Sequence, residues 1–326
     1  MVQCDRLAVD QTVAAPGSLA DPGALGSGPA AESGPRPKLT VRGVLRWLRT
    51  MAGIVPFGVY MTLGLLLPMA AVAIGAFRDP NGGGFTLSNV KTATHGVYLH
   101  GFEQSIILSV LTSILPGIFG LLIAYAIFTA KRGTVLRQAV ITASGVFANF
   151  GGVPLAFLFI ATLGSSGLAT RWLVDLGFDP YAHGFSLYNL GGVAVVYMYF
   201  QIPLMVLVIL PALEGLRSAW REAAENLGAR TWHYWRYVGG PVLFPSFLGC
   251  VLLLFGSALS AYATAEALTA GTIPLTSIQI GSFLNGNVIA GQENVGKALG
   301  LGMVVIIAAA MVIYVVLQRR AAKWLR

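Results

Sequence analysis

The chain has 326 residues, of which 56% are hydrophobic and only 10% are charged. A soluble domain carries about 25% charged residues, so this composition excludes an ordinary soluble protein and indicates one whose solvent is a lipid bilayer. The net charge of +8 is spread along the chain instead of being gathered in one groove, which argues against a nucleic-acid partner. Cys4 and Cys250 stand far apart and fit neither a disulfide framework nor a metal site.

The N-terminal region precedes any run long enough to cross a membrane. Residues 1–37 are rich in Ala, Gly, Pro and Ser without a hydrophobic period, so we expect a disordered cytoplasmic tail. Residues 38–50 place Arg42, Arg46 and Arg49 at helical spacing around Trp47, which predicts a basic juxtamembrane segment lying on the membrane surface. The membrane domain is then expected to occupy residues 51–326.

Six apolar runs follow, each close to the ~20 residues that cross a bilayer as a helix. They lie at about 52–77, 104–129, 138–163, 190–213, 242–267 and 299–318. The third run is the weakest, because Asn149, Gly151, Gly152 and Pro154 interrupt it. The fold class predicted is an all-α membrane protein with about six transmembrane helices.

The distribution of Lys and Arg predicts the orientation of these spans. With the N-terminus inside, only Arg78, Lys91, Arg171 and Lys297 of the 21 basic residues fall in outside loops. Basic residues concentrate on the cytoplasmic side of membrane proteins. Both termini are therefore predicted to be cytoplasmic, which requires an even number of spans.

The inside loop 214–241, between the fourth and fifth runs, carries the strongest local signal. Residues 222–227 are strong helix formers, and Gly228 can take the left-handed conformation that ends a helix. Thr231 is a plausible N-cap for a second helical run. This pattern predicts a helix–turn–helix across the cytoplasmic face, where Ala223 and Ala224 would let a partner approach and Glu222 would pair with a basic group on it.

The spacing in this loop resembles the cytoplasmic-loop signature of ABC-importer permeases. The signature residues are Glu222, Ala223, Ala224, Gly228, Trp235, Val238 and Pro241. The resemblance covers about residues 50–326 and implies a type I importer permease fold, with the loop as a coupling helix that docks into an ATPase subunit. At position 240 this chain has Gly where the family usually has Leu. This departure from the pattern suggests a looser start to the fifth span. The alternative interpretation is a loop helix that merely lies on the membrane. Such a helix would have to reproduce the same spacing of the signature residues.

The resemblance also implies partners and a location. They are two copies of an ABC ATPase subunit, a second permease subunit, an extracytoplasmic solute-binding protein and the lipid bilayer of a bacterial inner membrane. ATP and Mg²⁺ would be bound by the ATPase and no cofactor by this chain. The run from Gly291 to Lys297 resembles a phosphate-binding loop, but Ala298 replaces the hydroxyl residue that would hold Mg²⁺.

The sequence constrains the transported substrate less than it constrains the class of protein. Residues 261–271 and 296–326 are similar to the spermidine/putrescine branch, which favours a polyamine, while the ferric iron, thiamine, phosphonate and sulfate branches remain alternatives. An ion-coupled secondary transporter is an alternative of a different class. It would carry intramembrane carboxylates or inverted halves, which are not evident apart from Glu266.

Glu266, near the outer end of the fifth run, is the candidate pathway residue. A carboxylate within the membrane costs free energy, which favours a functional role, and Glu266 is therefore predicted to attract a cationic substrate. The equal alternative is an interfacial carboxylate that reaches the water of the lipid headgroups. Tyr262, Thr264 and Asn149 are expected on the same path from their positions in the spans. No nucleophile–base pair or paired carboxylates occur in a catalytic arrangement, so an enzyme is not expected.

Overall fold

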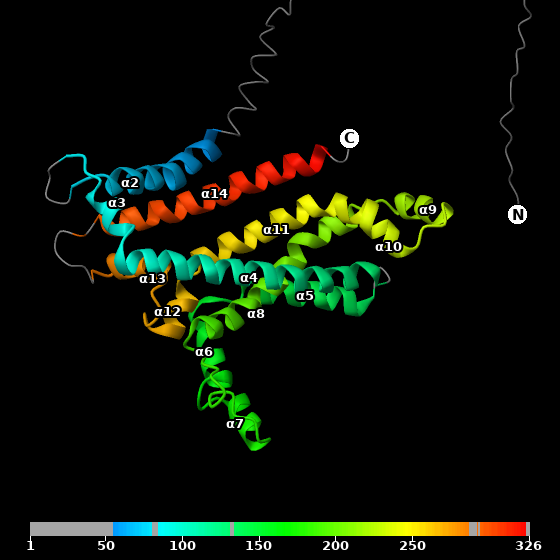
Figure 1. Cartoon of the computed structure of the whole chain (residues 1–326), viewed down its shortest axis with the longest axis horizontal. Coiled ribbons are helices and arrows are strands. Elements are labelled where there is room, and N and C mark those ends of the chain that lie inside the picture. The colour runs from blue at the N-terminus through cyan, green and yellow to red at the C-terminus, as the bar shows by residue number, and fades with distance from the viewer. Residues whose placement is uncertain (1–54, 80–83, 131–133, 287–291, 293, 324–326) are drawn as a thin grey trace, which may run out of the picture. The chain divides into compact units, whose positions relative to one another are not determined.

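The computed structural model describes residues 55–79, 84–130, 134–286, 292 and 294–323 (Figure 1). The side chains of residues 321–323 are not part of this description. The predicted tail 1–37 and juxtamembrane segment 38–50 lie outside the described residues.

Helices account for all regular structure in the described part of the chain, where the only β pairing is an isolated bridge between Arg78 and Phe85. The elements are η1 (Thr62–Leu66), α2 (Leu67–Ala76), α3 (Ser88–Ala93), α4 (Gly96–Thr129), α5 (Val135–Asn149), α6 (Gly152–Leu163), α7 (Leu168–Asp175), α8 (Leu190–Glu214), α9 (Ser218–Asn226), α10 (Thr231–Tyr234), η2 (Trp235–Gly239), α11 (Gly240–Ser260), α12 (Ala263–Thr269), α13 (Thr276–Leu284) and α14 (Val295–Lys323). The segments η1 and η2 are π-helical.

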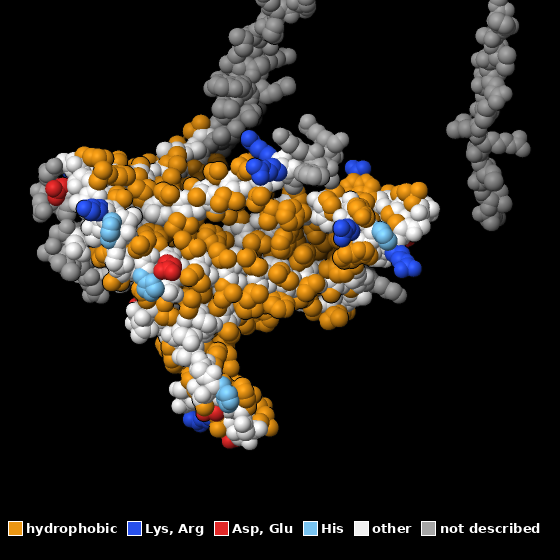
Figure 2. Space-filling view, viewed as in Figure 1, with side chains coloured by type: hydrophobic (Ala, Val, Ile, Leu, Met, Phe, Trp, Pro, Cys, Tyr) orange, Lys and Arg blue, Asp and Glu red, His pale blue; other side chains and the backbone are white. Residues whose placement is uncertain are grey.

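Six helical segments among the described residues are long and apolar enough to cross a membrane. They are Val55–Ala76, Gly96–Thr129, Gly152–Asp175, Leu190–Glu214, Thr231–Ser260 and Val295–Arg320. Apolar side chains cover the middle of these helices, and charged side chains lie near their ends (Figure 2). The predicted all-α fold with six spans is confirmed.

The third predicted span, 138–163, is not one helix. Its chain breaks after α5, and Gly152 begins α6 with φ +74°. The Gly152 N–H donates to Thr264 Oγ1 at 2.8 Å, a bond to a residue on α12 instead of to the preceding turn. A left-handed glycine and a diverted N–H end the helical ladder, which explains the break at the residues that weakened the pattern.

The fifth predicted span, 242–267, is wrong at both ends. Continuous helix begins at Thr231 and stops at Ser260, so α12 is a separate short helix. The Ala261 carbonyl, freed at this break, accepts a hydrogen bond from Tyr197 Oη at 2.8 Å. Tyr197 is fully buried on α8, so the break is fixed by a neighbouring helix.

Close contact between α4 and α8 forms the centre of the described bundle. A side chain at Gly120 would come within 2.5 Å of Met205 Cβ and 2.9 Å of the Ile202 carbonyl oxygen. Gln201, also on α8, is fully buried and donates to the Leu254 carbonyl of α11 at 3.2 Å. Small residues and interhelical hydrogen bonds hold membrane helices together because lipid offers no hydrophobic drive for their association.

Candidate functional site

The loop between α8 and α11 forms a helix that stands free of the bundle core. Helix α9 follows Gly215–Arg217, and none of its side chains is buried. Figure 1 places α9 and α10 at the end of the long helices opposite α3 and α13. A helix with every side chain accessible is available to a partner along its whole length.

Gly228 ends α9 in a Schellman motif. Its N–H donates to the Glu225 carbonyl at 2.9 Å, and the Ala229 N–H donates to the Ala224 carbonyl at 3.0 Å. Gly228 has φ +76°, the left-handed conformation that such a motif requires. The conformation predicted for this glycine is confirmed.

The charges of α9 are divided between an internal pair and a free carboxylate. Arg221 Nε donates to Glu225 Oε1 at 3.0 Å, and this carboxylate raises the pKa of Arg221. Within the described residues Glu222 has no ion-pair partner, and it is exposed beside Ala223. Glu222 is therefore the acidic group of α9 that remains available to a basic partner.

The second half of the predicted helix–turn–helix differs from the expectation. Thr231 is not an N-cap: the cap position is Arg230, and no side chain caps the helix there. The residues from Thr231 continue through η2 into α11 without a break, so they do not form a separate surface helix. Residues 227–230 therefore separate α9 from a helix long enough to span a membrane.

A π-helical turn joins α10 to α11. The Gly240 N–H donates to the Trp235 carbonyl, five residues back, and Pro241 has no N–H to give. A side chain at Gly240 would lie 2.5 Å from the Trp235 carbonyl oxygen. Glycine at position 240 permits this close backbone contact, and the looser start expected there stays a prediction. Val238 lies half-buried within this turn.

Aromatic side chains fix the π turn to the bundle. The Trp235 ring lies edge-on to Tyr125 of α4, with 5.1 Å between centroids, and 5.6 Å from Tyr234, which is buried. At the same end an ion pair between Arg137 and Glu214 joins α5 to α8. Sequence analysis missed Tyr125, Arg137 and Glu214, because their partners are distant in the chain and no local spacing marks them.

Three of the four candidate pathway residues fall on α12 or at its start, and the fourth, Asn149, ends α5. Thr264 is buried and bonds Gly152 at the start of α6, while Asn149, at the exposed end of α5, donates to the Gly145 carbonyl at 2.9 Å. Tyr262 packs against Gly281 of α13.

Glu266 lies half-buried on α12, and its Oε2 atom is buried with no hydrogen-bond partner among the residues that the structure describes. Because α12 is separate from α11, this carboxylate belongs to a short helix beyond the fifth span and not to the span itself. A buried carboxylate oxygen without a donor is costly unless a ligand, water or partner supplies one.

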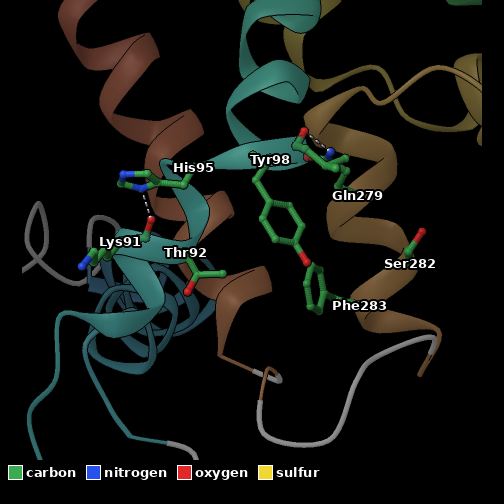
Figure 3. A pocket seen from close by; sticks show the side chains of 9 residues that line it. Lys91, Thr92, His95, Tyr98, Gln279, Ser282 and Phe283 are labelled. Atoms are coloured by element: carbon green, nitrogen blue, oxygen red, sulfur yellow. Dashed lines mark hydrogen bonds between the residues drawn. The ribbon is translucent and has the colours of Figure 1, made fainter.

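A cavity of about 690 Å³ opens at the α3–α13 end of the bundle. Figure 3 shows Tyr98 pointing toward Phe283 between α4 and α13, with Lys91 and His95 on the α3 side. Gln279 donates to the Val97 carbonyl at 3.0 Å. This end therefore offers a partly polar recess built from three elements.

Comparison with known proteins identifies the arrangement. The family described as binding-protein-dependent transport system inner membrane component matches residues 118–326, which include α9, the π turn and α12. The chain belongs to this family. Membership makes it a multi-pass membrane component of a transport system and not an enzyme, and it gives no support to the ion-coupled alternative.

Two curated relatives belong to such systems. The sulfate transport system permease protein CysT of Escherichia coli (strain K12) is 31% identical over 206 residues, 62% of this chain and 69% of CysT. The thiamine transport system permease protein ThiP of the same strain is 28% identical over 164 residues, 50% of this chain. The alignment spans only 29% of the length of ThiP.

Solved structures agree with the family in fold. A bacterial ABC transporter involved in import of the acidic polysaccharide alginate matches with TM-score 0.69 and 18% identity, covering 86% of this chain and 98% of the other. The MetNI methionine ABC transporter matches with TM-score 0.52 and 14% identity, covering 70% and 97%. The predicted ABC-importer permease fold is confirmed.

Proposed function

We propose that this chain is the permease subunit of an ATP-driven importer and that α9 is its coupling helix. The observation that carries the proposal is the combination of a fully accessible α9, closed by Gly228, with an unbroken helix from Thr231 to Ser260. Family membership supports the same conclusion. The proposal includes an orientation with α9 and both termini in the cytoplasm, on the basis of the Lys and Arg distribution.

Coupling would proceed through two mechanical connections. ATP and Mg²⁺, bound by two ATPase copies, would bring these subunits together and move the two docked α9 helices. The π turn passes that movement to α11, while Glu214 and Arg137 pass it from the end of α8 to α5. The ATPase state would thereby shift the bundle between inward-open and outward-open conformations. A second permease subunit would complete the pathway, and a solute-binding protein would deliver substrate at the α3–α13 end.

We further propose a small charged solute as the substrate. The sulfate and thiamine systems of the relatives support this class, while neither relative supports the polyamine expected from sequence. The unpartnered Oε2 of Glu266 favours a cation such as thiamine over the sulfate dianion. Tyr262, Thr264 and Asn149 would border the same region.

The coupling proposal is tested by a charge reversal on α9. Glu222→Lys should abolish co-purification of the ATPase subunit and ATP-dependent uptake, because α9 would present a cation where a basic partner group is expected. Glu103→Lys is the matched control, since Glu103 is an exposed carboxylate of α4 near the opposite end of the bundle. Normal ATPase attachment by Glu222→Lys, or uptake driven by an ion gradient without an ATPase, would refute the proposal.

The substrate proposal is tested by uptake assays in reconstituted vesicles with the complete transport system. Glu266→Gln should reduce thiamine uptake by about tenfold or more if the carboxylate contacts the cation, consistent with the strength of charge-assisted hydrogen bonds. Unchanged uptake of a cationic substrate would remove Glu266 from the pathway. Sulfate uptake by the wild type, with no thiamine uptake, would assign the anion instead.

A further inference from the structure

An apolar groove lies beside the π turn. Its volume is about 390 Å³, and α4, α8, α10, η2 and α11 contribute to its walls. Leu122, Tyr125, Phe244 and Phe247 line it, with Trp232 and Trp235 at the end nearest α9. Trp232 is 68% exposed and Phe244 is 48% exposed, so the groove is open at the side.

A second, polar cavity of about 250 Å³ adjoins the groove. The two share Tyr125 and Trp235 as lining residues, so the polar cavity begins where the apolar groove ends. Arg217 and Arg221 line the polar cavity, together with Glu214 and the hydroxyl residues Thr129 and Ser218.

The charges of the polar cavity leave it available to an anion. Glu214 is paired with Arg137, and Glu225 lies 3.0 Å from Arg221. Arg217 has no carboxylate within ion-pair distance among the described residues, and its guanidinium lies over the Trp220 ring at 5.8 Å. The cavity therefore presents the guanidinium of Arg217, which has no carboxylate partner among the described residues, and that of Arg221, which is bonded to a carboxylate on one side only.

We propose that the groove and the cavity together bind one anionic phospholipid. An acyl chain fits the apolar groove, and the phosphate reaches Arg217 and Arg221 past the tryptophans. This order matches a lipid at a membrane boundary, where aromatic rings lie at headgroup level and basic pockets between helices bind anionic headgroups. An occupant without an anionic group would leave the guanidinium of Arg217 without a counter-charge at the end of the groove.

The position of this lipid gives it a regulatory consequence, which rests on the proposed coupling function. The lipid would contact Trp235 of the π turn and Arg221 of α9 at once. It would thereby stabilise one position of α9 relative to α4. Coupling efficiency should then depend on the anionic lipid content of the membrane.

The headgroup half of the proposal is tested by native mass spectrometry of the full-length chain. The probes are phosphatidylglycerol and phosphatidylcholine with identical acyl chains. We expect wild type to retain phosphatidylglycerol about tenfold more than phosphatidylcholine. Arg217→Gln with Arg221→Gln should remove this preference. Arg230→Gln with Arg236→Gln is the matched control, because it removes the same charge from the same loop at exposed residues outside both cavities.

The groove half is tested with a filling substitution. Leu122→Trp should reduce retention of both lipids, whereas Leu253→Trp, at an exposed leucine of α11 outside the groove, should not. Equal retention of the two lipids by wild type, equal effects of the two arginine pairs, or unchanged retention by Leu122→Trp would each overturn the proposal. So would a lipid-free dimer that Leu122→Trp dissociates, since a second chain would then fill the groove. These outcomes are independent of ATPase attachment by Glu222→Lys, so the lipid site and the coupling function fail separately.

Discussion

Gly228 and Gly240 each occupy a position that favours glycine, for different physical reasons. Gly228 has a left-handed backbone, and a Cβ there would meet nothing within 4 Å, so its constraint is conformational. Gly240 has no such φ, but a Cβ there would collide with the Trp235 carbonyl, so its constraint is space. Of the two roles, only the first follows from local sequence pattern.

Gly228→Ala should weaken the end of α9 by about 1 kcal/mol, because non-glycine residues are strained in the left-handed region. We expect reduced co-purification of the ATPase with little change in expression. Gly215→Ala is the control in the same loop, since Gly215 has φ −72° and its Cβ would meet only ordinary contacts at 3.5 Å. Equal behaviour of the two variants would contradict a conformational role for Gly228.

At the scale of elements, the π turn joins α10, which follows α9 after residues 227–230, to the membrane-length helix α11. Pro241 has no N–H to donate to the helical ladder, and the Gly240 N–H before it bonds the Trp235 carbonyl five residues back. Trp235 holds this turn against Tyr125, so the turn is anchored while α9 is free. A turn packed against the bundle beside an accessible helix is the arrangement that the proposed coupling requires.

Gly240→Ala should destabilise the protein by about 1–3 kcal/mol, the cost of forcing extra atoms into a packed site. The measurement is the thermal unfolding midpoint in detergent. Gly256→Ala, in the same helix with open space around its Cβ, should be neutral or stabilise by up to about 1 kcal/mol. A midpoint for Gly240→Ala equal to that of Gly256→Ala would show that the π turn relaxes freely.

At the scale of the whole molecule, the proposed mechanism depends on which side of the membrane holds α9. An importer whose ATPase is cytoplasmic needs α9 inside, and the basic residues predict that placement. The arrangement of the described helices is compatible with either direction across a bilayer. The sidedness is therefore a property to measure.

Cysteine labelling with a membrane-impermeant maleimide measures it, in a background with Cys4→Ser. Ser218→Cys, exposed at the start of α9, should react only when the cytoplasmic face is accessible. Ser88→Cys, exposed at the start of α3, should react in intact cells. The opposite pattern would place α9 outside and refute the coupling function.

The sequence by itself determined the number of spans and the end of α9. The spans can be predicted from the sequence because the backbone in lipid must satisfy its hydrogen bonds within each segment. A long apolar run therefore forms a helix. The role of Gly228 in ending α9 can be predicted from the sequence because a Schellman motif involves only neighbouring residues.

Only the tertiary structure decided where the third and fifth spans break and how the coupling element is anchored. The break at Gly152 depends on Thr264, 112 residues away, and the end of α11 depends on Tyr197 of α8. The pairing of Arg137 with Glu214 joins residues 77 apart. Such contacts form only when helices distant in sequence pack together, so the local spacing of residues does not predict them.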